Sequence, residues 1–192
     1  SRPGAPPARG RPHAGSQRGG GLPSRAPVHG RHQGAHGRLA GPPAPLDLER
    51  ERAVQAACLA AIEAGCVRSA HDCAEGGLAV ALAECCITAP RPLGAEITLD
   101  PEGRLDELLF GEAPSRIVLT VAPDEWSRFE RIVREWAVPV AALGRVGGDR
   151  LTIRVGDRVG VAVALPAMRD AFTRVFERWV GGLAEQPSEG AA

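Results

Sequence analysis

The run from His71 to Glu84 constrains this chain more than any other feature, because it leads through two glycines into an almost wholly apolar segment. Over residues 77–88, apolar side chains recur at helical spacing, the other faces are mostly Ala and Val, and Glu84 is the one charge. A helix that is apolar nearly all round is buried. The sequence therefore predicts a central helix over 77–88, with acidic and imidazole side chains at the turn before it.

The hydrophobic pattern elsewhere predicts further helices and strands. Helices are expected over about 17 residues after the N-cap Asp47 and ending at Gly65, around Leu105, Leu108 and Leu109, from Pro123, and from Pro166 to Gly181-Gly182. Strands are expected at 67–70, 95–99, 117–121, 138–146, 150–155 and 159–164, with hairpin turns at 147–149 and 156–157. This order predicts an α+β fold with a mixed, mostly antiparallel sheet packed with helices.

Each long helix has a predicted apolar face that should pack into a core. These faces comprise Val54, Ala57, Cys58, Ala61 and Ile62; Leu78, Ala81, Leu82, Cys85 and Cys86; Trp126, Phe129, Val133 and Trp136; and Phe172, Val175, Phe176 and Trp179.

The first 45 residues have a different composition from the rest. They carry seven arginines, no acidic residue and almost no large apolar side chain, so they cannot bury enough surface to offset their chain entropy. We expect a disordered tail over 1–45, a folded domain over 46–184 and a second disordered tail over 185–192. The first tail is open to three interpretations: a basic nucleic-acid-binding arm, a solvated extension, or the product of a GC-rich gene read in a wrong frame.

Charge and cysteine usage narrow the classes of function. Outside the first tail the chain has 16 arginines against 23 acidic residues, which argues against nucleic-acid binding by the folded part. The odd number of cysteines, none in a Cys-x-x-Cys pair, indicates reduced thiols in a cytoplasmic protein. The sequence shows no signal peptide and no apolar run long enough to span a bilayer.

The turn before the central helix has a functional and a structural interpretation. Asp72 can bind a Mg²⁺ ion carried by a nucleotide, since Mg²⁺ takes one or two carboxylates plus phosphate oxygens. Alternatively, Asp72 caps the helix and His71 makes a structural hydrogen bond. The spacing disfavours a zinc site made of His71, Cys73, Cys85 and Cys86, and a Cys73 nucleophile would need a base and an electropositive setting.

Four segments carry a family resemblance. Residues 71–84 resemble the run His-Asp-x-Ser-Asp-Gly-Gly-Leu-Ala-Val-Ala-Leu-Ala-Glu, and residues 109–116 resemble Leu-Phe-Gly-Glu-Ser-x-x-Arg, here a loop with a charged pair of Glu112 and Arg116. Residues 41–47 resemble Gly-x-Pro-Pro-x-Leu-Asp, and residues 143–146 resemble Leu-Gly-x-Val. Together they resemble the C-terminal, AIR-synthase-like domain of the phosphoribosylformylglycinamidine synthase family.

The resemblance implies a fold, ligands and partners. It implies an AIR synthase C-terminal-domain-like fold that binds ATP or ADP with Mg²⁺, the metal at Asp72 and the nucleotide also at His71, Glu75, Gly76 and Gly77, with no catalytic residue in this chain. The family converts formylglycinamide ribonucleotide, ATP and glutamine-derived ammonia to formylglycinamidine ribonucleotide in purine biosynthesis. Its expected partners are upstream synthetase domains, a glutaminase subunit and a small accessory subunit.

Departures from the family pattern leave other functions open. Ala74 and Ala113 stand where the family has serine, and Glu75 stands where it has aspartate. The upstream domains that carry the family's catalytic histidine and main ATP site are absent, so we expect the chain to be an inactive fragment with an exposed apolar patch. The alternatives are a non-catalytic nucleotide-binding module of the AIR synthase and selenophosphate synthetase superfamily, or a scaffold whose basic tail holds a polyanion.

Overall fold

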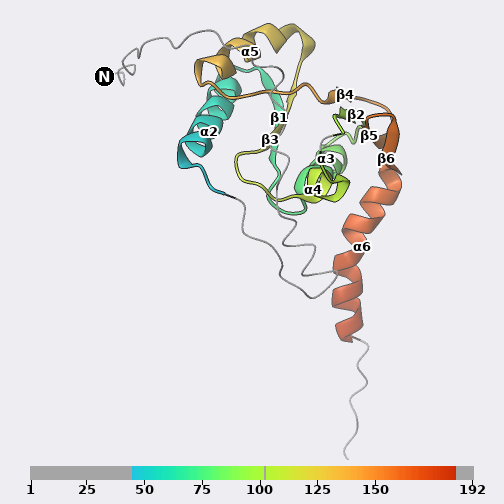
Figure 1. The fold of residues 1–192 in the computed structure, drawn as a ribbon. Coiled ribbons are helices and arrows are strands. Elements are labelled where there is room, and N and C mark those ends of the chain that lie inside the picture. Colours follow the sequence, from blue (N-terminus) through green and yellow to red (C-terminus); the bar gives the residue numbers. More distant parts are fainter. Residues whose placement is uncertain (1–44, 102, 185–192) are drawn as a thin grey trace, which may run out of the picture.

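The computed structural model describes residues 45–101 and 103–184, with side chains described as far as residue 174 (Figure 1). The predicted tails, residues 1–44 and 185–192, lie outside the described residues. The helices are α2 (Leu48–Glu63), α3 (Gly77–Thr88), α4 (Leu105–Phe110), α5 (Trp126–Glu135), which a 3₁₀ turn η1 (Pro123–Glu125) precedes, and α6 (Leu165–Ala184). The strands are β1 (Val67–Asp72), β2 (Ala95–Leu99), β3 (Ile117–Val121), β4 (Gly144–Val146), β5 (Arg150–Val155) and β6 (Arg158–Ala164).

The strands form two separate sheets. β1 and β3 make an antiparallel pair, and the larger sheet has the order β4-β2-β5-β6. Only β2 and β5 run parallel, while β2–β4 and β5–β6 are antiparallel. The predicted α+β fold with mixed, mostly antiparallel strands is therefore confirmed.

The first core lies between α3 and the four-stranded sheet. Ala95, Ile97 and Leu99 alternate with exposed residues along β2, so one face of this strand is buried. Leu151 and Ile153 of β5 continue the same face and are among the most deeply buried side chains of the described residues. The predicted central helix is confirmed, because both faces of α3 near its start are covered: Leu78, Ala79, Ala81 and Leu82 are all buried.

The second core lies between the β1–β3 pair and the helices α2 and α5. Ala57 and Ala61 of α2 meet Phe129 and Val133 of α5 around the buried Cys66. The ends of the predicted apolar faces were wrong, since Ile62 and Trp136 are each 45% exposed. Ile62 lies in the last turn of α2, and Trp136 is the C-cap residue that follows α5.

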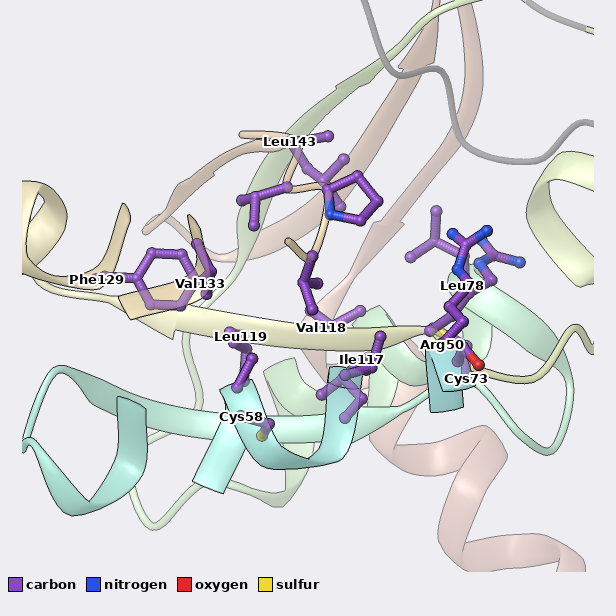
Figure 2. Close-up of a pocket in the computed structure, with 18 residues that line it drawn as sticks. Arg50, Cys58, Cys73, Leu78, Ile117, Val118, Leu119, Phe129, Val133 and Leu143 are labelled. Carbon is purple, nitrogen blue, oxygen red and sulfur yellow. The ribbon is translucent and has the colours of Figure 1, made fainter. Parts of the chain in front are cut away.

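A groove runs along β3 between α2 and the segment 138–143, and its cavity volume is about 150 Å³ (Figure 2). Its walls are mostly apolar and include Val54, Leu119, Phe129, Val140 and Leu143. The groove shows that α2, β3 and the chain leading into β4 do not close completely on one another.

The helix ends follow local chemistry in two cases and not in a third. Asp47 caps α2 as predicted, because its Oδ1 accepts hydrogen bonds from the backbone N–H groups of Glu49 and Arg50 at 3.0 Å. Gly65 follows the helix with φ of +77°, the left-handed conformation that favours glycine. The predicted end of α6 at Gly181-Gly182 was wrong, since the helix continues to Ala184. Phe172 of its predicted apolar face is exposed, and the side chains of Val175, Phe176 and Trp179 lie outside the described residues.

The segment Gly147-Gly148-Asp149 does not form the hairpin that its sequence predicts. β4 and β5 each pair with β2, which lies between them, so the turn crosses the end of β2. Gly94, just before β2, is held there by two backbone hydrogen bonds: its N–H donates to Gly148 O at 3.0 Å, and its O accepts from Gly147 N–H at 2.8 Å. β4 is also shorter than the predicted strand over 138–146. The hairpin at Gly156 and Asp157 is confirmed, since β5 and β6 are antiparallel neighbours.

We predict that Gly94→Ala destabilises the fold through this crossing. A Cβ at Gly94 would lie 2.1 Å from Arg150 O, and backbone cannot yield as a flexible side chain does. The free energy of unfolding in urea should fall by roughly 1–3 kcal/mol. Gly160→Ala is the matched control, because its Cβ would meet nothing closer than 3.6 Å, and it should change that free energy by about 0.5 kcal/mol or less. Equal losses in the two variants would contradict the crossing geometry.

Candidate functional site

Asp72 is the last residue of β1, which is two residues longer than predicted. Pairing with β3 extends the strand, with His71 opposite Val118 and Asp72 opposite Ile117. The ladder continues past the strand, because Cys73 N–H donates to Arg116 O at 3.1 Å. The strand therefore delivers the Asp72 carboxylate to the turn before α3, where the side chain is 70% exposed.

Asp72 does not cap α3, so the structural alternative for this residue was wrong. The N-cap position of α3 is Gly76, which has no side chain of its own to cap the helix. Among the described residues, the one polar group recorded near the Asp72 carboxylate is His71 Nδ1, at 3.7 Å from Oδ1. Within the described residues, no hydrogen bond is recorded for this exposed carboxylate.

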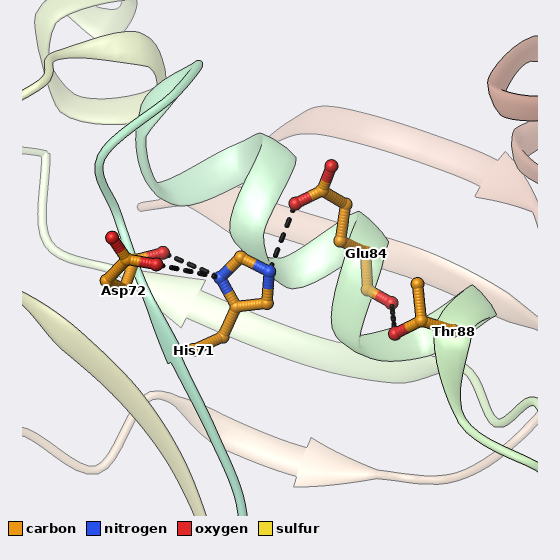
Figure 3. Close-up of polar contacts among 4 residues, drawn as sticks. All are labelled: His71, Asp72, Glu84 and Thr88. Atoms are coloured by element: carbon orange, nitrogen blue, oxygen red, sulfur yellow. Dashed lines mark hydrogen bonds and ion pairs between the residues drawn. The ribbon is translucent and has the colours of Figure 1, made fainter.

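His71 connects β1 to α3 (Figure 3). Its Nε2 lies 3.0 Å from Glu84 Oε2, and its Nδ1 lies 2.7 Å from the backbone oxygen of Asp72. Both ring nitrogens are therefore engaged within the protein, as the structural alternative proposed. A direct contact between His71 and a nucleotide stays a prediction.

The two glycines of the turn have separate roles. Gly76 has φ of +76°, and its N–H donates to Glu112 Oε1 at 2.9 Å. A Cβ at Gly77 would lie 2.7 Å from the backbone carbon of Phe110 and 2.8 Å from Gly111 O. Gly77 is therefore needed for the close approach of α3 to the end of α4. Nucleotide contacts by Gly76, Gly77 and the exposed Glu75 stay predictions.

The second motif joins the first in space, but not through the expected charged pair. Among the described ion pairs there is none between Glu112 and Arg116. Instead, the Glu112 carboxylate binds the Gly76 N–H, and Arg116 Nη1 donates to Gly111 O at 3.1 Å. The sequence offered no signal for the Glu112–Gly76 contact, since 36 residues separate its two partners. The contact shows that an anionic oxygen fits against the backbone at the start of α3.

The cysteine-based alternatives do not assemble. Within 45–101 and 103–184, no three His, Cys, Asp or Glu side chains come together as a metal site. Cys73 is 3% exposed, and burial raises the pKa of its thiol although Arg116 opposes the shift. A buried thiol with a raised pKa is a poor nucleophile. None of the helices in the described part of the chain has the length and apolar character of a membrane span.

Comparisons with known proteins show the family of this chain. The family description "AIR synthase related protein, C-terminal domain" matches residues 19–156. The chain belongs to this family. Its AIR synthase related fold is also found in solved structures: that of PurLQS from Thermotoga maritima has a TM-score of 0.57 at 21% identity, with 74% of this chain and 24% of that one covered. T. maritima PurL complexed with ATP has a TM-score of 0.56 at 22% identity, with 64% of this chain and 22% of that one covered.

Curated relatives are more similar in sequence. Phosphoribosylformylglycinamidine synthase subunit PurL from Anaeromyxobacter sp. (strain Fw109-5) is 42% identical over 167 residues, which are 80% of this chain and 22% of the relative. The PurL subunit from Moorella thermoacetica is 48% identical over 133 residues, which are 69% of this chain and 18% of the relative. This member of the AIR synthase related family therefore spans about a fifth of the length of the curated relatives it matches.

We predict that the fold loses stability at alkaline pH through its cysteines. Burial, together with the nearby Cys85, raises the pKa of Cys86 to about 11. The unfolded thiol ionises near about 8.5, so the unfolded state loses its proton first. Stability should therefore fall as the pH rises from about 9 to about 11, by roughly 1–3 kcal/mol. The chain contains no lysine and no tyrosine, which otherwise titrate in this range.

Urea unfolding at pH 7 and at steps up to pH 11 measures this loss, with each variant referred to its own value at pH 7. Cys86→Ala should reduce the loss, while the buried Cys66 and Cys73, whose thiol pKa values burial also raises, should account for much of the rest. Cys58→Ala is the control, because this half-buried thiol lies outside the first core, and this variant should retain most of it. An unchanged pH profile in Cys86→Ala would refute the assignment.

Proposed function

We propose that this chain is the C-terminal AIR-synthase-like part of a phosphoribosylformylglycinamidine synthase. The observation that carries the proposal is the 42% identity, over 80% of the chain, with a protein named as the PurL subunit of that enzyme. The same naming recurs at 48% identity. It favours the synthase over a stand-alone nucleotide-binding module of the wider superfamily.

In this proposal the parent enzyme is an ATP-dependent ligase of purine biosynthesis. ATP activates the amide oxygen of formylglycinamide ribonucleotide, ammonia from glutamine displaces phosphate, and formylglycinamidine ribonucleotide results. PurL of T. maritima has been solved in complexes with FGAR, ATP, ADP and AMPPCP, which supports a nucleotide ligand for this family member too. The proposed partners are the upstream synthetase domains, a glutaminase subunit and a small accessory subunit, in the cytoplasm.

Within this chain, we assign the nucleotide contact to the turn between β1 and α3. The Asp72 carboxylate is exposed and has no recorded hydrogen bond in the described part of the chain, which suits a Mg²⁺ ligand. Within the described residues, no group of three or more His, Cys, Asp or Glu side chains forms a metal site, so most of the ligands would be phosphate oxygens and water, as is usual for Mg²⁺. The N-terminus of α3 carries a partial positive charge that favours anions, and the Glu112 carboxylate already accepts from the Gly76 N–H there.

We predict that Asp72→Asn weakens Mg·ADP binding about tenfold or more, since the substitution keeps the shape of the side chain and removes its charge. Isothermal titration of the full chain with ADP, with and without Mg²⁺, measures the effect. Asp157→Asn is the matched control, because Asp157 is also exposed but lies in the β5–β6 hairpin. Equal affinities in the two variants would refute the role of Asp72.

A gain-of-affinity variant strengthens this test. Ala74→Ser with Glu75→Asp restores the two family residues that this turn lacks, adding a hydroxyl for a phosphate and shortening the acidic arm. The double variant should bind Mg·ADP more tightly than the unmodified chain. If the unmodified chain and the double variant both fail to bind at millimolar ADP, the turn is not a nucleotide site.

We predict that the chain alone does not turn over formylglycinamide ribonucleotide. The chain spans about a fifth of the length of its relatives, and the family resemblance implies no catalytic residue within it. Incubation with this substrate, ATP, Mg²⁺ and ammonium, followed by product detection, tests the expectation. Formation of formylglycinamidine ribonucleotide above the rate of a heat-inactivated sample would overturn it.

A further inference from the structure

We propose that the groove along β3 is the docking site for an extended strand supplied by another polypeptide segment. This strand would be apolar at alternate positions and would carry an acidic group at the end nearest Arg50 and Arg116. One end of the groove lies beside the Asp72 turn, since Cys73 and Leu78 line it, but the proposal does not depend on nucleotide binding.

The first argument is the open edge of β3. Within the described residues β3 pairs only with β1, in a sheet of two strands. A strand bonds to one neighbour with alternate backbone groups, so its other N–H and C=O groups point away from β1. None of the described backbone hydrogen bonds outside the regular elements reaches residues 117–121. Such an edge is a template for one more strand.

The second argument is the chemistry of the groove walls. Figure 2 shows Leu119 and Phe129 toward one end of the groove and Leu143 in the segment above the strand. Val140 also lines the groove. Val140 is 43% exposed although its neighbours across the groove are apolar. Apolar walls beside an open edge suit a strand whose alternate side chains are apolar, since successive side chains of a strand point to opposite faces.

The third argument is charge. The groove is lined by two arginines, Arg50 and Arg116, and by no acidic side chain. Arg50 Nε is buried without a hydrogen-bond partner, and the one hydrogen bond recorded for the Arg116 guanidinium goes to Gly111 O. Figure 2 shows Arg50 close to Cys73 and Leu78, and Arg116 immediately precedes β3 in the chain. A carboxylate at this end of an incoming strand would satisfy the unpaired donors.

The fourth argument is that the sequence before α2 does not supply such a strand. Among residues 1–44 the large apolar side chains are Leu22, Val28 and Leu39 alone, separated by many Gly and Pro residues, and residues 185–192 contain none. Proline cannot donate to a strand ladder, and no stretch of this segment has alternating apolar positions. We therefore assign the docked strand to a polypeptide segment outside this chain.

The test uses two synthetic peptides that alternate valine and threonine over six residues, with glutamate added at the first or the last position. Amide hydrogen exchange of the full chain is followed by mass spectrometry with each peptide at millimolar concentration. At least one peptide should slow exchange in residues 117–121 severalfold. The same peptides with a central proline should have no effect, because they cannot continue the ladder.

Variants test whether the acidic group of the docked strand lies beside Arg50. Arg50→Ala should weaken binding of the glutamate peptide about threefold, the effect expected from loss of a partly exposed ion pair. It should leave binding of a glutamine version of the peptide unchanged. Arg52→Ala is the matched control, since Arg52 is exposed on the same helix. The proposal fails if neither peptide slows exchange, if the proline peptides act equally, or if β3 becomes protected with rising protein concentration alone, which would assign the edge to a second copy.

Discussion

The burial of α3 is the interaction on which the rest of the structure depends. This helix packs one side against Ile97, Leu151 and Ile153 of the four-stranded sheet, and its first residue touches the end of α4. The contact with α4 requires a glycine at position 77, because any side chain there would collide with the backbone of Phe110. The helix axis and its N-terminus are thereby fixed, and with them the turn that follows Asp72. The candidate site is a consequence of core packing, and not a separate loop placed on the surface.

Local patterns predicted most elements of the fold, because periodicity and caps depend on neighbouring residues. Residues 77–88, 95–99 and 117–121 have the boundaries that their apolar patterns indicate. The order of the strands could not be predicted in the same way. Gly147-Gly148-Asp149 has the composition of a hairpin turn, yet β2, about fifty residues earlier in the chain, lies between the two strands it connects. That choice depends on long-range burial, which a local turn signal does not report.

The candidate site was likewise predictable only in part, because its motif is local in sequence and the contacts that hold it are not. The motif around Asp72 was visible in the sequence, and so were its two interpretations. Pairing with β3 decided against the helix cap, because it keeps Asp72 in strand geometry, before the first turn of α3. The contacts that hold the site, from His71 to Glu84 and from Gly76 to Glu112, join residues 13 and 36 positions apart. Nothing in the local sequence specifies such pairs, since both depend on how α3 and α4 meet.

The Asp72 turn lies where the two hydrophobic cores are joined. β1 packs with α2 and α5 in one core, α3 packs with the larger sheet in the other, and residues 73–76 form the direct covalent link between them. Asp72 belongs to the first body and the N-terminus of α3 to the second. A ligand that touched both would act as a clamp across this seam, and its binding energy would add to the cohesion of the two halves. The stability of this small domain would then rise with the fraction of its molecules that hold ligand.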